Sequence, residues 1–333
     1  MDYILLIVGI LTLTFSGNYL VKAAVELSKA LKMSTLVIGI VVVSFGTSMP
    51  ELVVSVGAAL NNHPEISVGN VIGSNIANIV LVLGITALII PIPVKKSTIK
   101  IDWNIMLLAS LLLIAFLLDS KLVFWEGLVF VILLISYILL SLIISRRRTK
   151  KNNEIKKPEY SLSFSIILII ISSVGLVFGA EWLIQGATGI AVGLGVSDLV
   201  ISVSLVAFGT SVPELATSII AALKKETDIS IGNIIGSNIF NIFGILGITS
   251  VIKSINIINP NLYINLYWML AAAFLLLLFL IPFGKKISAR FVEIIYFVVY
   301  YSTAKSGIIK KWEGGLFVSF YIIYIIWLIN GSF

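Results

Sequence analysis

The sequence predicts an all-α polytopic membrane protein of ten transmembrane helices, arranged as two inverted five-helix repeats in which helices 2 and 7 are broken. Three observations support this prediction. The composition is strongly apolar, the chain contains an internal duplication, and one long apolar run in each copy is interrupted by proline and glutamate.

The apolar composition sets the class of protein. Of the 333 residues 59% are hydrophobic and only 12% are charged, whereas a soluble domain has about 25% charged residues. Continuous apolar stretches recur along the chain at about 20 residues each, the length of a transmembrane helix rather than of a barrel strand. We place the spans near residues 3–21, 36–60, 66–92, 103–119, 122–144, 162–183, 195–222, 229–252, 262–283 and 313–330.

The distribution of basic residues predicts the orientation. If the connection at 22–32 lies in the cytoplasm and the spans alternate, 21 of the 23 lysines and arginines face the cytoplasm, leaving only Lys121 and Lys253 outside. This bias follows the positive-inside rule. We therefore expect a multi-pass protein of the cell membrane with extracellular termini and a cytoplasmic linker at 146–160. The net charge of +7 is thus explained by the basic residues that orient the helices in the membrane, and no nucleic-acid partner is expected.

One segment does not fit the count of spans. Residues 284–311 are too long for a tight turn, and the apolar stretch within them is too short to cross the bilayer. We interpret this segment as an interfacial helix or an ordered loop. If it contributed an eleventh span instead, the C-terminus would lie inside.

The residue types exclude several chemistries. The chain has no cysteine, and its single histidine, His63, lies beside Pro64 in a predicted loop, so thiol catalysis and cysteine or histidine metal centres are excluded. No serine–base pair is visible, so neither an enzyme nor a cofactor is expected. An ion channel is the other alternative, but channel pores are commonly built by symmetric subunits rather than by one duplicated chain.

The duplication is explicit in the sequence. Residues 34–85 align without a gap with residues 197–248 at an offset of 163, and 30 of the 52 pairs are identical. We divide the chain into a first repeat at 1–145, a basic linker at 146–160 and a second repeat at 161–333. Five spans per repeat is an odd number, so the second copy enters the membrane from the opposite side. Such inverted repeats are typical of secondary transporters, whose binding site lies between the repeats. One chain would contain a complete site, so we expect a functional monomer.

Two glutamates lie in the middle of predicted spans. Glu51 and its repeat counterpart Glu214 have no lysine or arginine at comparable depth. An ionisable group within the membrane is costly and marks a functional site unless a partner stabilises it. Two carboxylates supply two negative charges, which would balance one Ca²⁺ or hold one or two Na⁺. The structural alternative is a protonated, hydrogen-bonded pair.

A proline precedes each glutamate. Pro50 and Pro213 have no N–H group and clash with the carbonyl four residues earlier. We expect each helix to break, freeing carbonyl oxygens around 44–47 and 207–210, an arrangement tolerated in membranes only where it lines a site. A simple kink without ligation is the alternative.

Hydroxyl and amide side chains share the expected site. Thr47 and Ser48 lie four and three residues before Glu51, on the same helix face, and Ser74 and Asn78 are four apart in the next span. The second repeat contains the same set. Hard cations such as Ca²⁺ prefer such oxygen ligands, whereas soft metals prefer sulfur or imidazole.

The motif pairs Gly46–Glu51 with Gly209–Glu214 and Gly69–Asn78 with Gly232–Asn241 resemble the α-repeats of the cation/calcium antiporter superfamily, specifically compact prokaryotic sodium/calcium exchangers. The resemblance implies Na⁺ and Ca²⁺ as substrates, bound between the repeats, and sliding of the first and sixth helices to switch access. Backbone carbonyls of Ser44, Thr47, Ala207 and Thr210 would also bind ions. The implied side-chain ligands are Thr47, Ser48, Glu51, Ser74, Asn78, Thr210, Ser211, Glu214, Ser237 and Asn241.

Two departures and one alternative qualify the resemblance. Potassium-dependent exchangers have an acid where Asn241 stands, so the neutral Asn78 and Asn241 predict K⁺-independent exchange. Ser44 replaces the small apolar residue common in relatives. H⁺/Ca²⁺ exchange through the same glutamates stays open, because buried carboxyls can carry protons, although proton-coupled members typically lack the Gly46–Glu51 motif.

Overall fold

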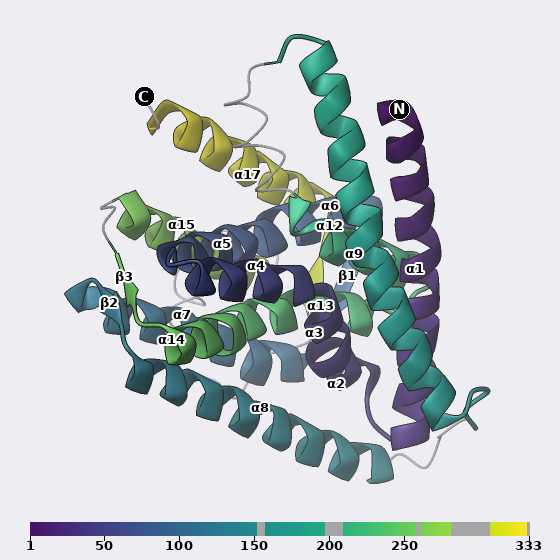
Figure 1. Ribbon diagram of the computed structural model, residues 1–333. Coiled ribbons are helices and arrows are strands. Elements are labelled where there is room, and N and C mark those ends of the chain that lie inside the picture. The colour runs from purple at the N-terminus through teal and green to yellow at the C-terminus, as the bar shows by residue number, and fades with distance from the viewer. Residues whose placement is uncertain (152–156, 197–208, 258–260, 281–306, 332–333) are drawn as a thin grey trace, which may run out of the picture.

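The computed structural model describes the chain except residues 152–156, 197–208, 258–260, 281–306 and 332–333 (Figure 1). Predicted features in those gaps, including Ala207 and most of 284–311, lie outside the described residues. The part of 284–311 that is described contains a short strand, β4 (Gly307–Ile309), and the first residue of the last helix.

The first half of the chain forms a series of helices, several of them interrupted by π-helical turns. Its elements are α1 (Asp2–Leu31), α2 (Thr35–Ile38), η1 (Gly39–Val43), α3 (Ser44–Thr47), α4 (Met49–Leu60), α5 (Glu65–Ile76), η2 (Ala77–Val82), α6 (Leu83–Ile89), β1 (Ile92–Val94), η3 (Thr98–Asp102), α7 (Trp103–Phe116), η4 (Leu117–Asp119), β2 (Lys121–Leu122) and α8 (Phe124–Lys151).

The second half repeats this order as far as it is described. Its elements are α9 (Leu162–Gly193), α12 (Val212–Leu223), α13 (Thr227–Ile239), η6 (Phe240–Leu246), α14 (Gly247–Ile252), β3 (Ile255–Asn256), α15 (Asn261–Leu280), β4 and α17 (Lys311–Gly331). Strand β1 pairs antiparallel with β4, and β2 with β3. Each of these two-stranded ribbons joins the first repeat to the second.

The described helices confirm the predicted membrane class. Eight of them are long and apolar enough to cross a membrane, and the bent pair 35–47 and 49–60 makes a ninth. The remaining predicted span, 195–222, is described at 195–196 and from Gly209 onward, and it contains the shorter helix α12. The fold is therefore the polytopic helical architecture expected from the sequence, with the predicted break in helix 2 observed directly.

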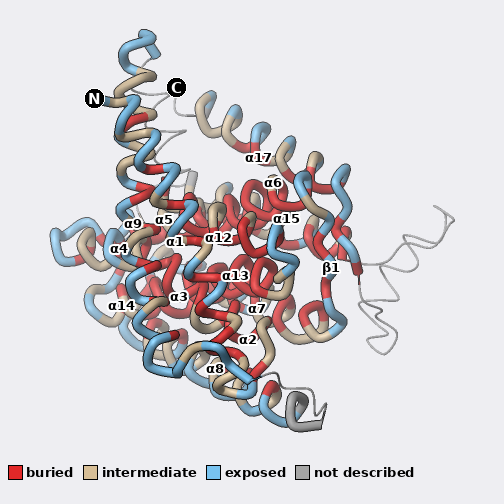
Figure 2. Tube along the Cα trace, turned by 90° about the vertical axis from the view of Figure 1, so that its right-hand side faces the viewer, coloured by how far each residue is buried: buried red, intermediate tan, exposed pale blue. Residues whose placement is uncertain are grey.

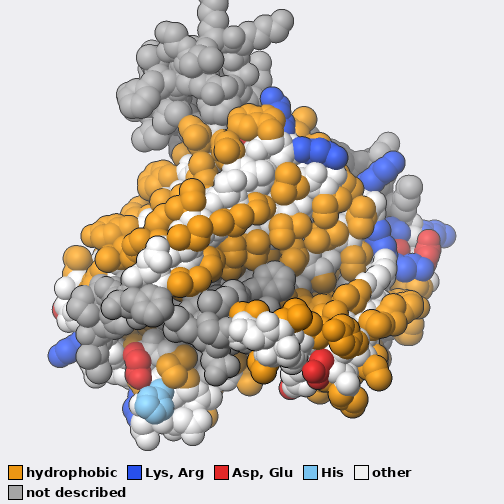
Figure 3. Space-filling model, turned by 90° about the horizontal axis from the view of Figure 1, so that it is seen from above, with side chains coloured by type: hydrophobic (Ala, Val, Ile, Leu, Met, Phe, Trp, Pro, Cys, Tyr) orange, Lys and Arg blue, Asp and Glu red, His pale blue; other side chains and the backbone are white. Residues whose placement is uncertain are grey.

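Two composite helices form the centre of the molecule. In α5–η2–α6 78% of the most apolar stretch is buried, and in α13–η6–α14 89%, against 22–28% for α1, α8, α9 and α17. Figure 2 shows the buried trace concentrated on the central helices. Large apolar side chains are exposed mainly on the outer helices and cover much of the surface seen in Figure 3. An apolar outside around a partly polar centre is the arrangement that a lipid environment requires.

The two longest helices, α1 and α9, lie side by side along most of their length (Figures 1 and 2). Glycines permit this close approach. A Cβ atom on Gly9 would lie 2.5 Å from the Leu183 nitrogen, and one on Gly186 would lie 2.5 Å from the Leu6 nitrogen. Because these neighbours are backbone atoms, the helices would have to separate to accept any side chain. Small residues have this role in membrane helix packing.

We expect Gly186→Ala to destabilise the protein by about 1–3 kcal/mol, the usual cost of overpacking. The matched control is Gly193→Ala in the same helix, where a Cβ atom would meet nothing within 4 Å and where alanine is the better helix former. Thermal unfolding in detergent, followed by tryptophan fluorescence, measures both. A melting temperature for Gly186→Ala equal to that of the control would contradict the packing argument.

Candidate cation-binding site

The predicted break in helix 2 lies at Ser48. The segments on either side of it are bent by 48°, and Ser48 leaves the helical region of backbone angles. Pro50 occupies the first turn of α4, where its missing N–H group costs nothing. One expectation was wrong: the Ser44 carbonyl is not freed, because it accepts a hydrogen bond of 2.9 Å from the Ser48 nitrogen.

The second repeat has the same local geometry where it is described. Ser211 has φ −88° and ψ 2°, close to the −88° and 11° of Ser48, and α12 begins at Val212 with Pro213 in its first turn. The near-identical motif thus gives the same helix start in both repeats. Each start places a glutamate, Glu51 or Glu214, in the first turn of its helix.

The second motif of each repeat leads into a π-helical segment that sequence reasoning did not predict. Asn78 is the second residue of η2, and Asn241 is the second residue of η6. Such widened turns often occur at functional sites. Helix α4, which contains Glu51, contacts η6, and α12, which contains Glu214, contacts η2. In each repeat, therefore, the helix that contains the glutamate packs on the asparagine-containing segment of the other repeat.

Hydrogen bonds connect five of the ten predicted side-chain ligands. Ser48 donates to Glu214 Oε1 across the repeats at 2.9 Å, and Ser237 donates to the same oxygen at 3.5 Å. The hydroxyls of Ser74 and Thr210 lie 3.3 Å apart. All predicted side-chain ligands except the partly exposed Thr210 are buried.

Glu51 stands apart from the other buried carboxylates. Neither of its oxygens has a hydrogen-bond partner among the described residues, and its side chain is fully buried. Glu26, Asp102 and Glu313 are also buried, but each accepts at least one hydrogen bond. No lysine or arginine is among the buried residues that the structure describes. A carboxylate in this position needs a partner that the described part of the protein does not supply.

Other polar atoms at the same site share this property. An unpartnered buried polar group costs about 1–3 kcal/mol, so a native protein normally has few of them. Here the described residues lack partners for Glu214 Oε2, Ser211 Oγ, Asn241 Oδ1 and both polar atoms of the Asn78 amide. The described residues contain no cluster of three or more histidine, cysteine or acidic side chains. The arrangement is thus suited to a cation that binds few carboxylates and many neutral oxygens.

Two asparagines outside the predicted ligand set support the glutamates. Asn70 donates to the Glu51 carbonyl at 3.2 Å and to Ser55 Oγ at 3.0 Å. Its counterpart Asn233 makes the same two contacts, with the Glu214 carbonyl and Ser218 Oγ. The sequence did contain a signal for these two residues, because both aligned positions, 163 residues apart, are asparagine within the second motif.

Tight packing joins the two repeats at the end of the molecule where α8 ends. A Cβ atom on Gly232 would lie 2.7 Å from the Leu36 carbonyl oxygen, and one on Gly236 would lie 2.6 Å from that of Ile40, so α13 fits directly against α2 and η1.

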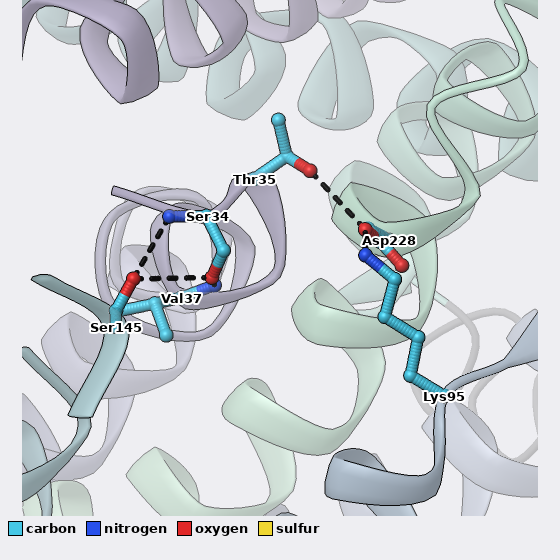
Figure 4. Close-up of polar contacts among 6 residues, drawn as sticks. All are labelled: Ser34, Thr35, Val37, Lys95, Ser145 and Asp228. Atoms are coloured by element: carbon cyan, nitrogen blue, oxygen red, sulfur yellow. Dashed lines mark hydrogen bonds and ion pairs between the residues drawn. The ribbon is translucent and has the colours of Figure 1, made fainter. Parts of the chain in front are cut away.

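Polar contacts fasten this end (Figure 4). Asp228, in the first turn of α13, accepts from the Thr35 hydroxyl at 3.3 Å and forms an ion pair with Lys95, while the Ser34 nitrogen donates to Ser145 of α8 at 2.8 Å. Asp228 thus joins the second repeat to the first at the start of the helix that contains Ser237.

Comparison with known proteins agrees with this geometry. The family described as sodium/calcium exchanger protein matches residues 1–143 and 164–330. The chain belongs to the sodium/calcium exchanger family. Among its relatives is the sodium/calcium exchanger MaX1 of Methanosarcina acetivorans, 29% identical over 98% of this chain and 97% of the relative. The inner membrane protein YrbG of Escherichia coli is 34% identical over 71% of this chain and 75% of the relative.

Solved structures of an exchanger share the fold. A structure of the sodium-calcium exchanger NCX_Mj superposes with a TM-score of 0.75 at 31% identity, covering 98% of each chain. Crystals of that protein were soaked with Na⁺, Ca²⁺ or Sr²⁺. Together these likenesses identify the present exchanger as a multi-pass membrane antiporter of the cation/Ca²⁺ class.

The hydrogen bond between Ser48 and Glu214 gives a test within this exchanger. In ion-free detergent solution we expect Ser48→Ala to lower stability by about 1.5–3 kcal/mol, the usual contribution of a hydrogen bond to a charged group. Ser211→Ala is the control at the matching repeat position, because Ser211 Oγ has no partner among the described residues. Thermal unfolding of both variants measures the difference in stability. Equal destabilisation of the two would show that this bond does not stabilise the protein.

Proposed function

We propose that the chain exchanges Na⁺ for Ca²⁺ by alternating access, without K⁺. The observation that supports this most directly is the buried glutamate pair, with Glu51 unpartnered and no buried lysine or arginine described nearby. Two like charges buried in one site would repel each other. Bound cations would remove this repulsion and supply the missing partner.

The proposed ligands combine two charges with many neutral oxygens. Ca²⁺ takes six to eight oxygen ligands, and the site offers carboxylate, hydroxyl, amide and backbone oxygens but no sulfur or imidazole. The family resemblance adds the backbone carbonyls of Thr47, Ala207 and Thr210, whereas the Ser44 carbonyl is already occupied by the hydrogen bond from the Ser48 nitrogen. The proposed side-chain ligands are Thr47, Ser48, Glu51, Ser74, Asn78, Thr210, Ser211, Glu214, Ser237 and Asn241.

The choice of coupling ion follows from the same residues. Asn78 and Asn241 are neutral, so the site has two carboxylates and no acid of the kind used by potassium-dependent relatives. This favours Na⁺ alone. The second candidate is H⁺/Ca²⁺ exchange, which the unpartnered Glu51 would permit, because a proton can also neutralise a buried carboxylate.

The organisation in the membrane belongs to the same proposal. The positive-inside rule supports a cytoplasmic 146–160 linker with both termini outside, so the packed end at Asp228 would face the cytoplasm. Residues of both repeats within one chain build the site, which supports a functional monomer. In this arrangement the α1–α9 pair, lying outside the central helices, is the element free to slide during alternating access.

Transport by purified protein tests the exchange. We expect Na⁺-loaded liposomes to take up ⁴⁵Ca²⁺ when diluted into Na⁺-free medium, with the same rate whether or not K⁺ is present. Uptake should survive an ionophore that collapses the pH gradient. Uptake driven by a pH gradient alone would establish the proton-coupled alternative, and a requirement for K⁺ would refute the proposed independence.

The glutamate pair itself is tested by substitution. Glu51→Gln and Glu214→Gln keep the side-chain size but remove one charge each, so we expect Ca²⁺ uptake to fall to the level of empty liposomes. Glu65→Gln, at the exposed start of α5, is the control. Gel filtration checks that each variant is folded. Retained Na⁺-driven uptake in both site variants would disprove the assignment.

A further inference from the structure

We propose that Asn75 is a positioning residue, which fixes the Asn241 amide so that its oxygen rather than its NH₂ group faces the bound cation. This inference rests on the proposed function. Asn75 belongs to α5 in the first repeat and Asn241 to η6 in the second, and both side chains are buried. Asn75 is not among the ligands that the sequence predicts.

A chain of hydrogen bonds connects the two asparagines to the backbone. Asn75 Nδ2 donates to the Asn238 carbonyl at 3.3 Å, and Asn75 Oδ1 accepts from Asn241 Nδ2 at 3.0 Å. The Asn238 backbone therefore contacts one end of the Asn75 amide, and Asn241 contacts the other. Both links run between the repeats.

Only one assignment of donors and acceptors fits this series of hydrogen bonds. A backbone carbonyl accepts hydrogen bonds and never donates them, so the end of Asn75 that faces Asn238 must be the NH₂ group. The opposite end is then the oxygen, which can only accept. Asn241 must present its NH₂ group to Asn75, and its own Oδ1 points elsewhere, without a partner among the described residues.

The orientation matters because the two ends of an amide differ in their use to a cation. The carbonyl oxygen is a ligand, whereas the NH₂ group carries partial positive charge and repels the ion. Without Asn75, rotation by 180° about the last side-chain bond would exchange the two ends at little steric cost. Outer partners that orient a metal ligand typically change affinity by about 10–100-fold when removed.

The matching residues of the other repeat do not form this series of hydrogen bonds, so it is not a general property of the motif. Asn238 corresponds to Asn75, but its side chain donates to the carbonyl of Ile234 within its own helix, at 2.8 Å. Asn78, the counterpart of Asn241, has no partner for either polar atom among the described residues. The two asparagines three residues apart, present in both repeats, thus give an oriented amide at Asn241 only.

The first test compares Asn75→Ala with Asn238→Ala in liposomes and, for binding without transport, by calorimetric Ca²⁺ titration in detergent. Asn238→Ala removes only the bond within its helix and keeps the backbone carbonyl. We expect Asn75→Ala to raise the half-saturating cation concentration about tenfold or more with little change in maximal rate, and Asn238→Ala to leave both near wild type. Unchanged half-saturation in Asn75→Ala overturns the proposal.

The second test separates orientation from a merely structural contact. The two oxygens of an aspartate are equivalent, so orientation is irrelevant in an Asn241→Asp background. There Asn75→Ala should not raise half-saturation, because Asn75 Oδ1 would face carboxylate oxygens that cannot donate to it, whereas a purely structural contact would give the same rise in both backgrounds and refute the proposal. If Asn75→Ala does not fold, Asn75→Ser serves in its place. Failure of wild-type Na⁺-driven uptake would count against the proposed function, while the calorimetric comparison still judges Asn75.

Discussion

The structure depends on the burial of two carboxylates in a protein surrounded by hydrocarbon. Moving an ion out of water costs several kcal/mol even after relaxation, and no lysine or arginine among the described buried residues balances Glu51 or Glu214. The other described buried acids are stabilised by hydrogen bonds near the ends of helices, whereas Glu51 has none. Packing of α5 and α13 at the centre, with their asparagines holding the glutamate backbones, keeps this costly arrangement in place.

The same cost explains why such a site would exchange ions rather than release them freely. With the site empty, any conformation that seals it from water leaves two negative charges without a cationic partner. Binding either one Ca²⁺ or sodium ions removes the penalty, so the sealed intermediate becomes accessible only when loaded. A ligand shifts a conformational equilibrium by its differential affinity for the two states. Two buried charges without a basic partner thus favour antiport over a leak.

The repeat, the glutamates and the proline break could be predicted from sequence because each depends on local chemistry or on self-similarity. The π segments η2 and η6 could not, because widening a helix by one residue reflects packing between helices rather than propensity. The prediction of a free Ser44 carbonyl was wrong because it also depended on backbone geometry that the sequence does not specify. Pro50 removes the N–H group of its own position only, and the bend at Ser48 still lets the Ser48 nitrogen reach Ser44. The Asn75–Asn241 bond joins residues 166 apart and required coordinates.

The differences between two nearly identical repeats are informative in themselves. Ser48 bonds Glu214, while Ser211 has no described partner, and Asn75 orients Asn241, while Asn238 bonds its own helix. The bonding residues are the same in both repeats, so their identity alone does not explain this asymmetry. An inverted repeat that alternates access must hold its two copies in different conformations at any moment and exchange them during the cycle. The bonds of Ser48 and Asn75 are thus where the two copies differ in the conformation described here.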